Sequence, residues 1–356
     1  MSTRQQLTVN SLNKQQSIDS IDDYLGPSET RFFSRGYQRA AYRVEGLAAD
    51  AVDAPQTGVR GTVDVSYPAD WSKKKQGTDL RPHLSTIDAL VLGVQLAELH
   101  LAHAYGLGPD DLSAARLRKV VLRAGSEPQE DLVGIPLAAR LKSPADEPGP
   151  DGLYRSQYEC TVGTLRVRCE IDHPIVHRAY HDAEFDSFDA VLGPGASRFY
   201  GDGFRLRRHS IQDIALDLDA LVAEAAVRFT TVPGSPVPAE GIGGARQPAV
   251  SLVDCFVVNL QLAQVLMYEL DGLSRANSNT LWMMQTAMTA PAEPDLLVLD
   301  DEDAPLRTRT AITAKHLLTV RGGIWRNVDL QASLAGIDMR CSFAHELPPE
   351  IAATAA

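Results

Sequence analysis

The chain has 356 residues, 44% of them hydrophobic, so it exceeds one typical domain and can fill more than one packed core. Its formal net charge is −12 at pH 7. Nucleic-acid-binding proteins need a basic face to neutralise phosphates, so we expect no nucleic-acid partner.

Residues 1–20 are polar and lack the apolar core of a signal peptide, so we predict a flexible N-terminal tail and a cytoplasmic protein. The cysteines show no close pairing and no zinc-ligand spacing, and we expect them to be buried thiols. The sequence predicts no metal site and no cofactor. The four cysteines are Cys160, Cys169, Cys255 and Cys341.

After the tail, the chain reads as two similar series of elements, each with two strands, one long helix and further strands. The first series has strands near 37–47 and 59–67, a helix within 84–105, and strands near 116–124, 134–142, 154–162 and 165–172. The second series has strands near 204–218 and 221–230, a helix within 250–270, and strands near 280–289, 306–320 and 324–345.

The two long helices are apolar enough to be mistaken for membrane spans. Each is interrupted by acidic and amide side chains, among them Asp88 and Glu98 in the first and Asp254 and Gln264 in the second. Such groups are costly in hydrocarbon, so we predict buried helices and no membrane partner.

Short motifs recur in the same order, which indicates an internal duplication. The sequence Leu-Gly-Pro followed by Arg-Phe occurs at Leu25 and again 167 residues later at Leu192. Ser-x-x-Asp followed by Gln-Leu-Ala occurs at Ser85 and again 166 residues later at Ser251. A third match pairs Arg168-Cys169 and His173 with Arg340-Cys341 and His345.

A helix that is apolar on nearly all sides must be covered on most of them, and the neighbouring strands supply an antiparallel sheet curling round it. We therefore predict an α+β protein with a double hot dog fold. The predicted divisions are a tail over 1–20, a first repeat over 21–173, a linker over 174–188, a second repeat over 189–347 and a C-terminal tail over 348–356.

Each helix carries a polar stripe that could face a ligand. Asp88 and Gln95 are seven residues apart on nearly one face, separated by about 10 Å of helical rise. Buried polar groups cost about 1–3 kcal/mol each if unpaired, so they need partners, water or a ligand. Predicted catalytic residues are Asp88 and Asp254, and predicted substrate-binding residues are Gln95, Glu98, Gln261 and Gln264.

A structural interpretation competes for the two aspartates. Ser85 with Asp88, and Ser251 with Asp254, match the capping box that satisfies free amides at a helix start. Capping and catalysis therefore both remain open for these acids, whereas Gln95, further into its helix, has no capping role.

Other candidates lie outside the helices. His83 precedes the first helix, where it could move a proton, and the corresponding residue in the second copy is Ala249. Arg31 and Arg198 could bind a substrate carboxylate or phosphate, or could pair with a buried acid to fix a turn. The run Lys73–Lys75 suggests docking of an acidic acyl carrier protein.

The run from Ile21 to Pro27, with Arg31-Phe32-Phe33 and Gly36-Tyr37, resembles the avirulence protein D (AvrD) family. This resemblance implies a role in making syringolide-type acyl glycosides, by joining a β-ketoacyl thioester to a ketose such as xylulose. More loosely, the helices resemble those of double hot dog dehydratases. The spacing of seven between Asp88 and Gln95 departs from the dehydratase pattern, so simple dehydration is not the leading expectation.

The leading hypothesis is therefore an acyl-transferring or condensing enzyme whose partners are a small sugar and an acyl thioester of coenzyme A or acyl carrier protein. A dehydratase or thioesterase of the same fold is the second hypothesis. A non-catalytic binder of an acyl or butenolide ligand is the third. Pairing of the chain with itself as a homodimer is left open.

Overall fold

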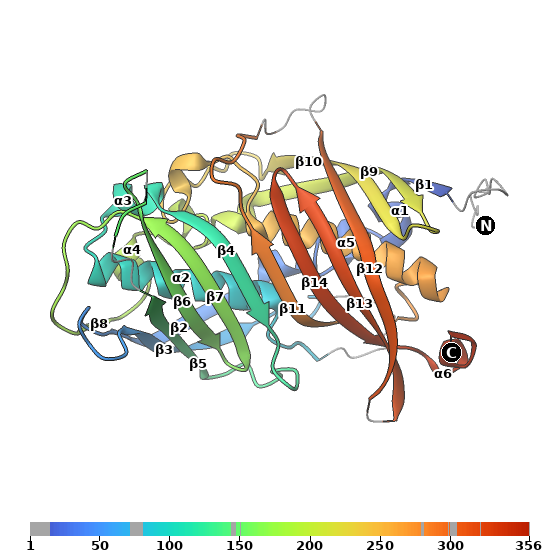
Figure 1. Cartoon of the computed structure of the whole chain (residues 1–356), viewed down its shortest axis with the longest axis horizontal. Helices are drawn as coiled ribbons and strands as arrows, with labels where there is room; N and C mark the ends of the chain where they lie inside the picture. The colour runs from blue at the N-terminus through green and yellow to red at the C-terminus, as the bar shows by residue number, and fades with distance from the viewer. Residues whose placement is uncertain are drawn as a thin grey trace.

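The computed structural model describes residues 15–71, 81–143, 147–149, 151–278, 281–297, 299, 305–320 and 322–355. The predicted docking run Lys73–Lys75 lies outside these residues. Within them, fourteen strands form one sheet in which every neighbouring pair is antiparallel. Figure 1 shows this sheet curling round two long helices.

The first half holds the strands β2 (Ala41–Ala49), β3 (Gly58–Ser66), β4 (Arg116–Arg123), β5 (Ile135–Ser143), β6 (Tyr154–Val162) and β7 (Leu165–His173). The second half repeats them as β9 (Arg207–Asp217), β10 (Val222–Thr231), β11 (Trp282–Thr289), β12 (Leu306–Val320), β13 (Gly323–Leu334) and β14 (Ile337–Glu346). The remaining strands are β1 (Gln15–Ser20) and β8 (Ala183–Phe185).

The strand order is the same when read from either edge, once each strand is exchanged for its counterpart in the other repeat. The order is β1-β9-β10-β12-β13-β14-β11-β4-β7-β6-β5-β3-β2-β8, and its centre is the antiparallel pair β4 and β11. The two halves therefore share one continuous sheet. This arrangement confirms the predicted double hot dog.

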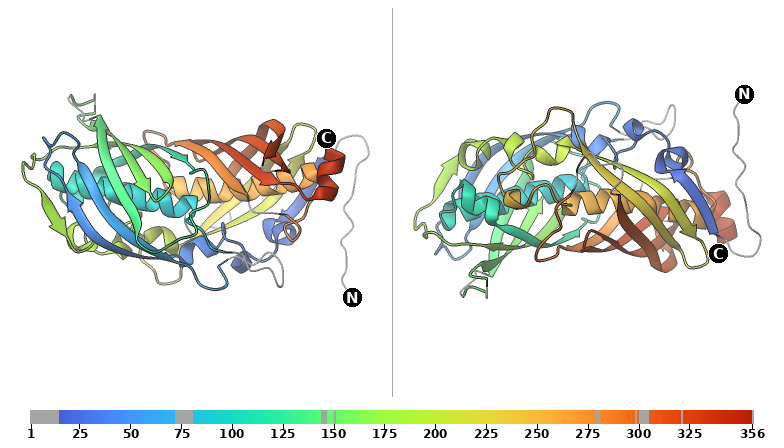
Figure 2. Two further views of the ribbon diagram at one scale, coloured as in Figure 1. Left: turned by 90° about the horizontal axis from the view of Figure 1, so that it is seen from below. Right: turned by 90° about the horizontal axis from the view of Figure 1, so that it is seen from above.

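The long helices are α2 (Thr86–Ala104) and α5 (Leu252–Asp271), and Figure 2 shows them following one another along the long axis of the molecule. Both are long and apolar enough to cross a membrane, yet 89% and 94% of their most apolar windows are buried by the surrounding protein. They are core helices, covered on all sides because their apolar residues are not confined to one face.

Short helices fill the connections between these elements. The α-helices are α1 (Ile21–Leu25), α3 (Pro109–Ala114), α4 (Asp189–Leu192) and α6 (Pro349–Ala355), and the 3₁₀ helices are η1 (Ser28–Thr30), η2 (Gly36–Arg39), η3 (Gly195–Ser197), η4 (Gly203–Leu206) and η5 (Gly244–Arg246).

The first segments of the two repeats are exchanged. Strand β1, from the first repeat, pairs with β9 of the second, and β8 pairs with β2 of the first. Helix α1 likewise packs on α5, while α4 packs on α2. Figure 1 shows β1 and α1 beside the second half, far from the strands that follow them in sequence.

Four of the predicted assignments need correction. Residues 15–20, assigned to the tail, form β1, and residues 183–185, assigned to the linker, form β8. Both segments are short, and their backbone groups are satisfied by strands distant in sequence, so local pattern does not reveal them. The predicted C-terminal tail contains α6, and the predicted strand 324–345 is a hairpin turning at Ala335 and Gly336.

Candidate functional site

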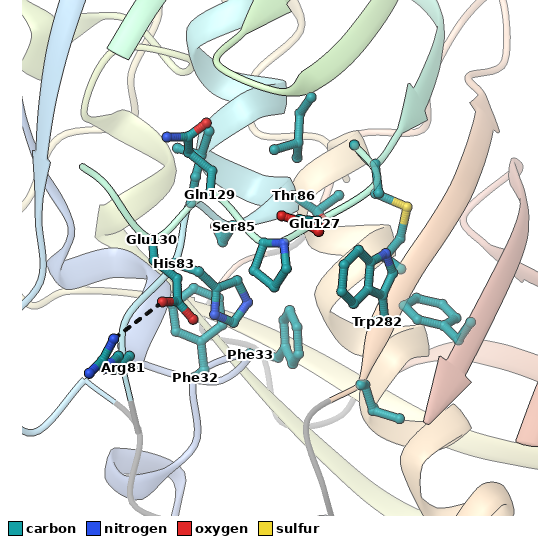
Figure 3. A pocket seen from close by; sticks show the side chains of 18 of the residues that line it. Phe32, Phe33, Arg81, His83, Ser85, Thr86, Glu127, Gln129, Glu130 and Trp282 are labelled. Carbon is teal, nitrogen blue, oxygen red and sulfur yellow. Dashed lines mark ion pairs between the residues drawn. The ribbon is translucent and has the colours of Figure 1, made fainter. Parts of the chain in front are cut away.

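A cavity of about 590 Å³ lies at the N-terminal end of α2, where residues of both repeats meet. Cavities of a few hundred to about 1,000 Å³ are typical of small-molecule sites. Figure 3 shows its interior, with His83, Glu130 and Phe32 on one side of the view and Trp282 on the other. Its principal lining residues are Arg31, Phe32, Phe33, Trp71, Arg81, His83, Ser85, Thr86, Glu127, Gln129, Glu130, Phe256, Gln264, Arg275, Trp282 and Met283.

Aromatic rings from separate elements form the apolar part of the wall. The Phe32 ring packs edge-on against Phe33 and Trp71, with ring centroids 5.2 and 5.4 Å apart. Phe33 in turn meets Phe256 of α5, 6.1 Å away. Because the exchanged first segment carries Phe32 and Phe33 onto α5, these contacts fix one wall across the two repeats.

His83 is the predicted catalytic residue that lines the cavity. It is half-buried, and its ring lies edge-on to Trp71 at 6.1 Å. The next residue, Leu84, donates its backbone N–H to the Gln129 carbonyl at 2.9 Å, which ties the start of α2 to the loop after β4. An imidazole at this position can exchange a proton with a bound ligand.

The start of α2 also faces the cavity, through Ser85 and Thr86. The first amides of a helix lack acceptors within the helix, and the helix dipole adds partial positive charge there. Ser85 Oγ already accepts the Asp88 N–H at 3.1 Å. The first turn can therefore polarise a carbonyl oxygen placed against Thr86.

The structure gives Asp88 a capping role. One carboxylate oxygen accepts the Tyr42 hydroxyl at 2.6 Å. The other accepts the Ser85 N–H at 3.0 Å, the Ser85 hydroxyl at 2.6 Å and the Tyr67 hydroxyl. Asp88 is fully buried and is not among the cavity lining, so its catalytic assignment is not supported by its position.

Asp254 caps α5 in the same way. Its carboxylate accepts the Ser251 N–H at 2.9 Å and the Ser251 hydroxyl at 2.8 Å, and it forms a buried ion pair with Arg207 at 2.9 Å. For both acids, the geometry therefore favours the capping role over the catalytic one.

Gln95 and Gln261 were predicted to bind the substrate, but neither lines the cavity. Gln261 Nε2 donates to the Phe33 carbonyl at 3.2 Å and to the Val257 carbonyl at 2.9 Å. It therefore positions a cavity-lining segment from behind. Gln95 is 5% exposed and does not line the cavity.

Glu98 and Arg198 form a buried ion pair across the exchanged segments. Arg198 Nη1 lies 3.5 Å from the Glu98 carboxylate, which also accepts the Ile242 N–H at 3.0 Å. Burial raises the pKa of Glu98, and the Arg198 charge opposes that rise. Both residues are structural here, as the alternative interpretation of Arg198 proposed.

Arg31 and Gln264 occupy the corresponding positions in the other half, and both line the cavity. Arg31 is 4% exposed and pairs with Asp22. Burial lowers the pKa of Arg31 to about 10, so it stays charged at neutral pH. The prediction that these two residues face a ligand is consistent with their position.

The second half has nearly lost the equivalent space. Near the start of α5, a cavity of about 70 Å³ is lined by Ala249, Ser251, Leu252 and Tyr200. Ala249 stands where the first copy has His83. One of the two related sites is therefore large and has a histidine before its helix, and the other is small and has an alanine there.

Several lining residues were not predicted. The loop after β4 contributes Glu127, Gln129 and Glu130, and β11 contributes Trp282. The stretch 125–130 lies between two predicted strands, and nothing local in the sequence shows that it lies against α2. Within the described part of the chain, no group of three or more His, Cys, Asp or Glu side chains is arranged to hold a metal ion.

The chain is similar in fold to solved structures of other proteins, at low identity. The tesB protein of Mycobacterium avium subsp. paratuberculosis matches with a TM-score of 0.37 and 8% identity, over 81% of this chain and 93% of that one. The dehydratase domain of PpsC from Mycobacterium tuberculosis matches with a TM-score of 0.34 and 11% identity, over 85% and 98%. Such distant likeness does not identify a reaction.

No curated protein sequence matches this chain. Residues 16–348 match the family model described as Pseudomonas avirulence D protein (AvrD), which spans both repeats and the exchanged segments. The resemblance carried by the run from Ile21 to Tyr37 is thereby confirmed, and the chain belongs to the AvrD family.

Proposed function

We propose that this protein is an enzyme that acts on an acyl thioester in the cavity at the start of α2. The observation that carries the proposal is the asymmetry between the two related sites, of about 590 and 70 Å³. A concave, partly apolar pocket with a few convergent polar groups is typical of a small-molecule site.

The lining suggests a role for each part of the site. The thioester carbonyl would lie against Thr86, where the first turn of α2 stabilises negative charge developing on its oxygen. His83 would move the proton of the attacking or leaving group. The acyl chain would lie along the aromatic wall of Phe32, Phe33 and Trp282.

At a finer level, the reaction that we propose joins a β-ketoacyl group to a ketose such as xylulose. It rests on family membership together with a site that combines an apolar wall with polar groups from Arg81, Gln129 and Glu130. A sugar hydroxyl held by these polar groups would attack the thioester carbonyl while His83 accepts its proton. The carbon–sulfur bond would then break, the thiol would leave with the proton returned by His83, and the acyl–sugar ester would remain.

The test is incubation of the purified protein with a β-ketoacyl thioester, with and without xylulose, followed by mass spectrometry. A coupled acyl–sugar product supports the proposal. Free acid or an α,β-unsaturated thioester formed without sugar would indicate a thioesterase or dehydratase instead. Tight thioester binding with no product over long incubation would indicate a binding protein.

A variant pair tests the role of His83. We expect His83→Gln to lower kcat by about 100-fold or more, with an unchanged melting temperature. The matched control is His316→Gln on β12, which is exposed and outside the cavity lining. Equal turnover in the two variants would remove His83 from the mechanism.

A further inference from the structure

The buried pair around Arg198 shows what an arginine at this position requires. Its Nε donates to the Gly193 carbonyl at 3.1 Å, and its Nη2 donates to Asp189 at 2.9 Å. Its Nη1 faces Glu98, 3.5 Å away. Every nitrogen of this guanidinium has a partner, and a carboxylate from the central helix balances its charge.

The duplication places Arg31 in the same setting, but two of its three nitrogens lack the partners that Arg198 has. Arg31 corresponds to Arg198, and Asp22 to Asp189, each 167 residues earlier. The counterpart of Glu98 on α5 is Gln264, which has no charge. Among the described residues, Nε and Nη1 of Arg31 are buried without a hydrogen-bond partner.

Arg31 forms an ion pair with one acid, whereas Arg198 forms ion pairs with two. Arg275 also lines the cavity, and its guanidinium donates to neutral acceptors, including the Thr30 carbonyl at 2.6 Å. The half-exposed Asp22 carboxylate is the acid that pairs with Arg31. A buried guanidinium in this state is destabilising unless an anionic group completes it.

We propose that Arg31 and Gln264 form a subsite that binds a carboxylate group of the ligand, at the position where the other half holds the Glu98 carboxylate. This inference uses the cavity of the proposed function and adds a substrate class to it, namely an acyl compound that carries a carboxylate. Gln264 donates its amide N–H to the bound group, while Arg31 supplies the charge.

The neighbouring residues fit a carboxylate attached to an apolar chain. Phe256 lies on α5 two turns before Gln264, and Phe33 lies two residues after Arg31, so apolar wall adjoins the charged nitrogens. Inorganic phosphate would satisfy Arg31 but would leave this apolar surface uncovered. The two anions therefore make different predictions.

The test is isothermal titration calorimetry of the full chain with decanoate, methyl decanoate and inorganic phosphate. We expect decanoate to bind about tenfold or more tightly than its uncharged ester, because the ester cannot balance Arg31. No detectable decanoate binding, equal binding of the ester, or tighter binding of phosphate would each overturn the proposal.

Gln264→Glu is the decisive variant, because it restores the acid of the other half. We expect it to raise the melting temperature and to weaken decanoate binding by about tenfold or more, since the protein's own carboxylate occupies Arg31. The control is Gln285→Glu, which makes the same charge change at an exposed position on β11. Unchanged decanoate affinity in Gln264→Glu would contradict the subsite.

These measurements need no turnover, so they are separate from the test of the proposed function. If the protein turns over a thioester but does not bind decanoate, only the proposal of a carboxylate subsite is overturned. Decanoate binding that Gln264→Glu weakens, without turnover of any thioester, would overturn the enzymatic proposal alone.

Discussion

At the scale of single residues, the repeated acids show how one motif can suggest two roles. The spacing of Ser85 and Asp88 is what a helix cap requires, and it also places an acid near a predicted site. The structure separates these roles because Asp88 binds the protein's own donors through both carboxylate oxygens, and Asp254 does so through one. The apolar neighbours of an acid in the sequence predict that it is buried. They do not predict its hydrogen-bond partners, which come from distant parts of the chain.

The first prediction concerns Asp254. Replacing it with Asn leaves the Arg207 guanidinium buried without its counter-charge, so we expect the free energy of unfolding to fall by about 3 kcal/mol. Urea unfolding measures the change, with the exposed Asp338→Asn as the control. We expect the folded Asp254→Asn protein to keep its catalytic turnover, and a loss of turnover without a loss of stability would restore the catalytic assignment.

A second prediction follows from His100. Its imidazole is fully buried, between the Thr57 hydroxyl at 2.9 Å and the Tyr158 hydroxyl at 2.8 Å. Burial, with smaller contributions from His103 and His173, lowers the pKa of His100 from 6.5 to about 3. Between these values the unfolded chain binds a proton that the folded protein does not, so stability falls with falling pH.

We therefore expect His100 to contribute a loss of about 1.4 kcal/mol per pH unit below pH 6. Urea unfolding from pH 7 to 4.5 measures the slope, and the His100→Gln protein should show a slope smaller by this amount. The same slope in both proteins would mean that His100 is protonated in the folded state. His316→Gln, at an exposed site, controls for the loss of a histidine.

At the scale of elements, the sequence predicted the two long helices and most strands to within a few residues. Alternation and long apolar runs are local properties, so α2, α5 and strands such as β6 follow from them directly. The strand predicted near 37–47 begins only at Ala41, because residues 36–39 form η2, where Gly36 packs against the Trp71 carbonyl. A side chain there would collide with that oxygen, and this contact is not visible in the sequence.

The third prediction tests the helix caps as elements. Ser251→Ala removes the side chain that accepts the Asp254 N–H at 3.1 Å, so we expect a loss of about 1 kcal/mol of stability. Thermal unfolding followed by circular dichroism measures it. Ser342→Ala, in the middle of β14, is the comparison for loss of a hydroxyl without loss of a cap. An unchanged melting temperature for Ser251→Ala would show that the cap contributes little.

At the scale of the whole molecule, the exchange of first segments was not predictable. Periodicity reports that Ile21 and Leu25 are buried, but not which half buries them. The cavity depends on this exchange, because it carries Arg31 and Phe33 of the first repeat onto α5 of the second. The lining of the cavity was therefore predicted in part, with His83, Arg31 and Gln264 named, while Trp282 and the loop after β4 were missed.

The fourth prediction is that the two repeats do not fold separately. A fragment of residues 1–180 lacks β9 as the partner of β1, and a fragment of 181–356 lacks β2 as the partner of β8. Each also loses the pairing of β4 with β11. We expect each fragment alone to be unfolded or aggregated, and the two expressed together to form one soluble complex, as measured by size-exclusion chromatography and circular dichroism. Cooperative unfolding of either fragment alone would contradict this.

The continuous sheet through β4 and β11 also bears on the origin of the chain. An ancestor of half the length would have been a homodimer whose subunits traded their first segments and held two equal cavities. Gene fusion made the two copies of every position independent, so one could keep a histidine where the other accepted Ala249. The half with the small cavity then supplies the sheet and helix that complete the wall of the large one.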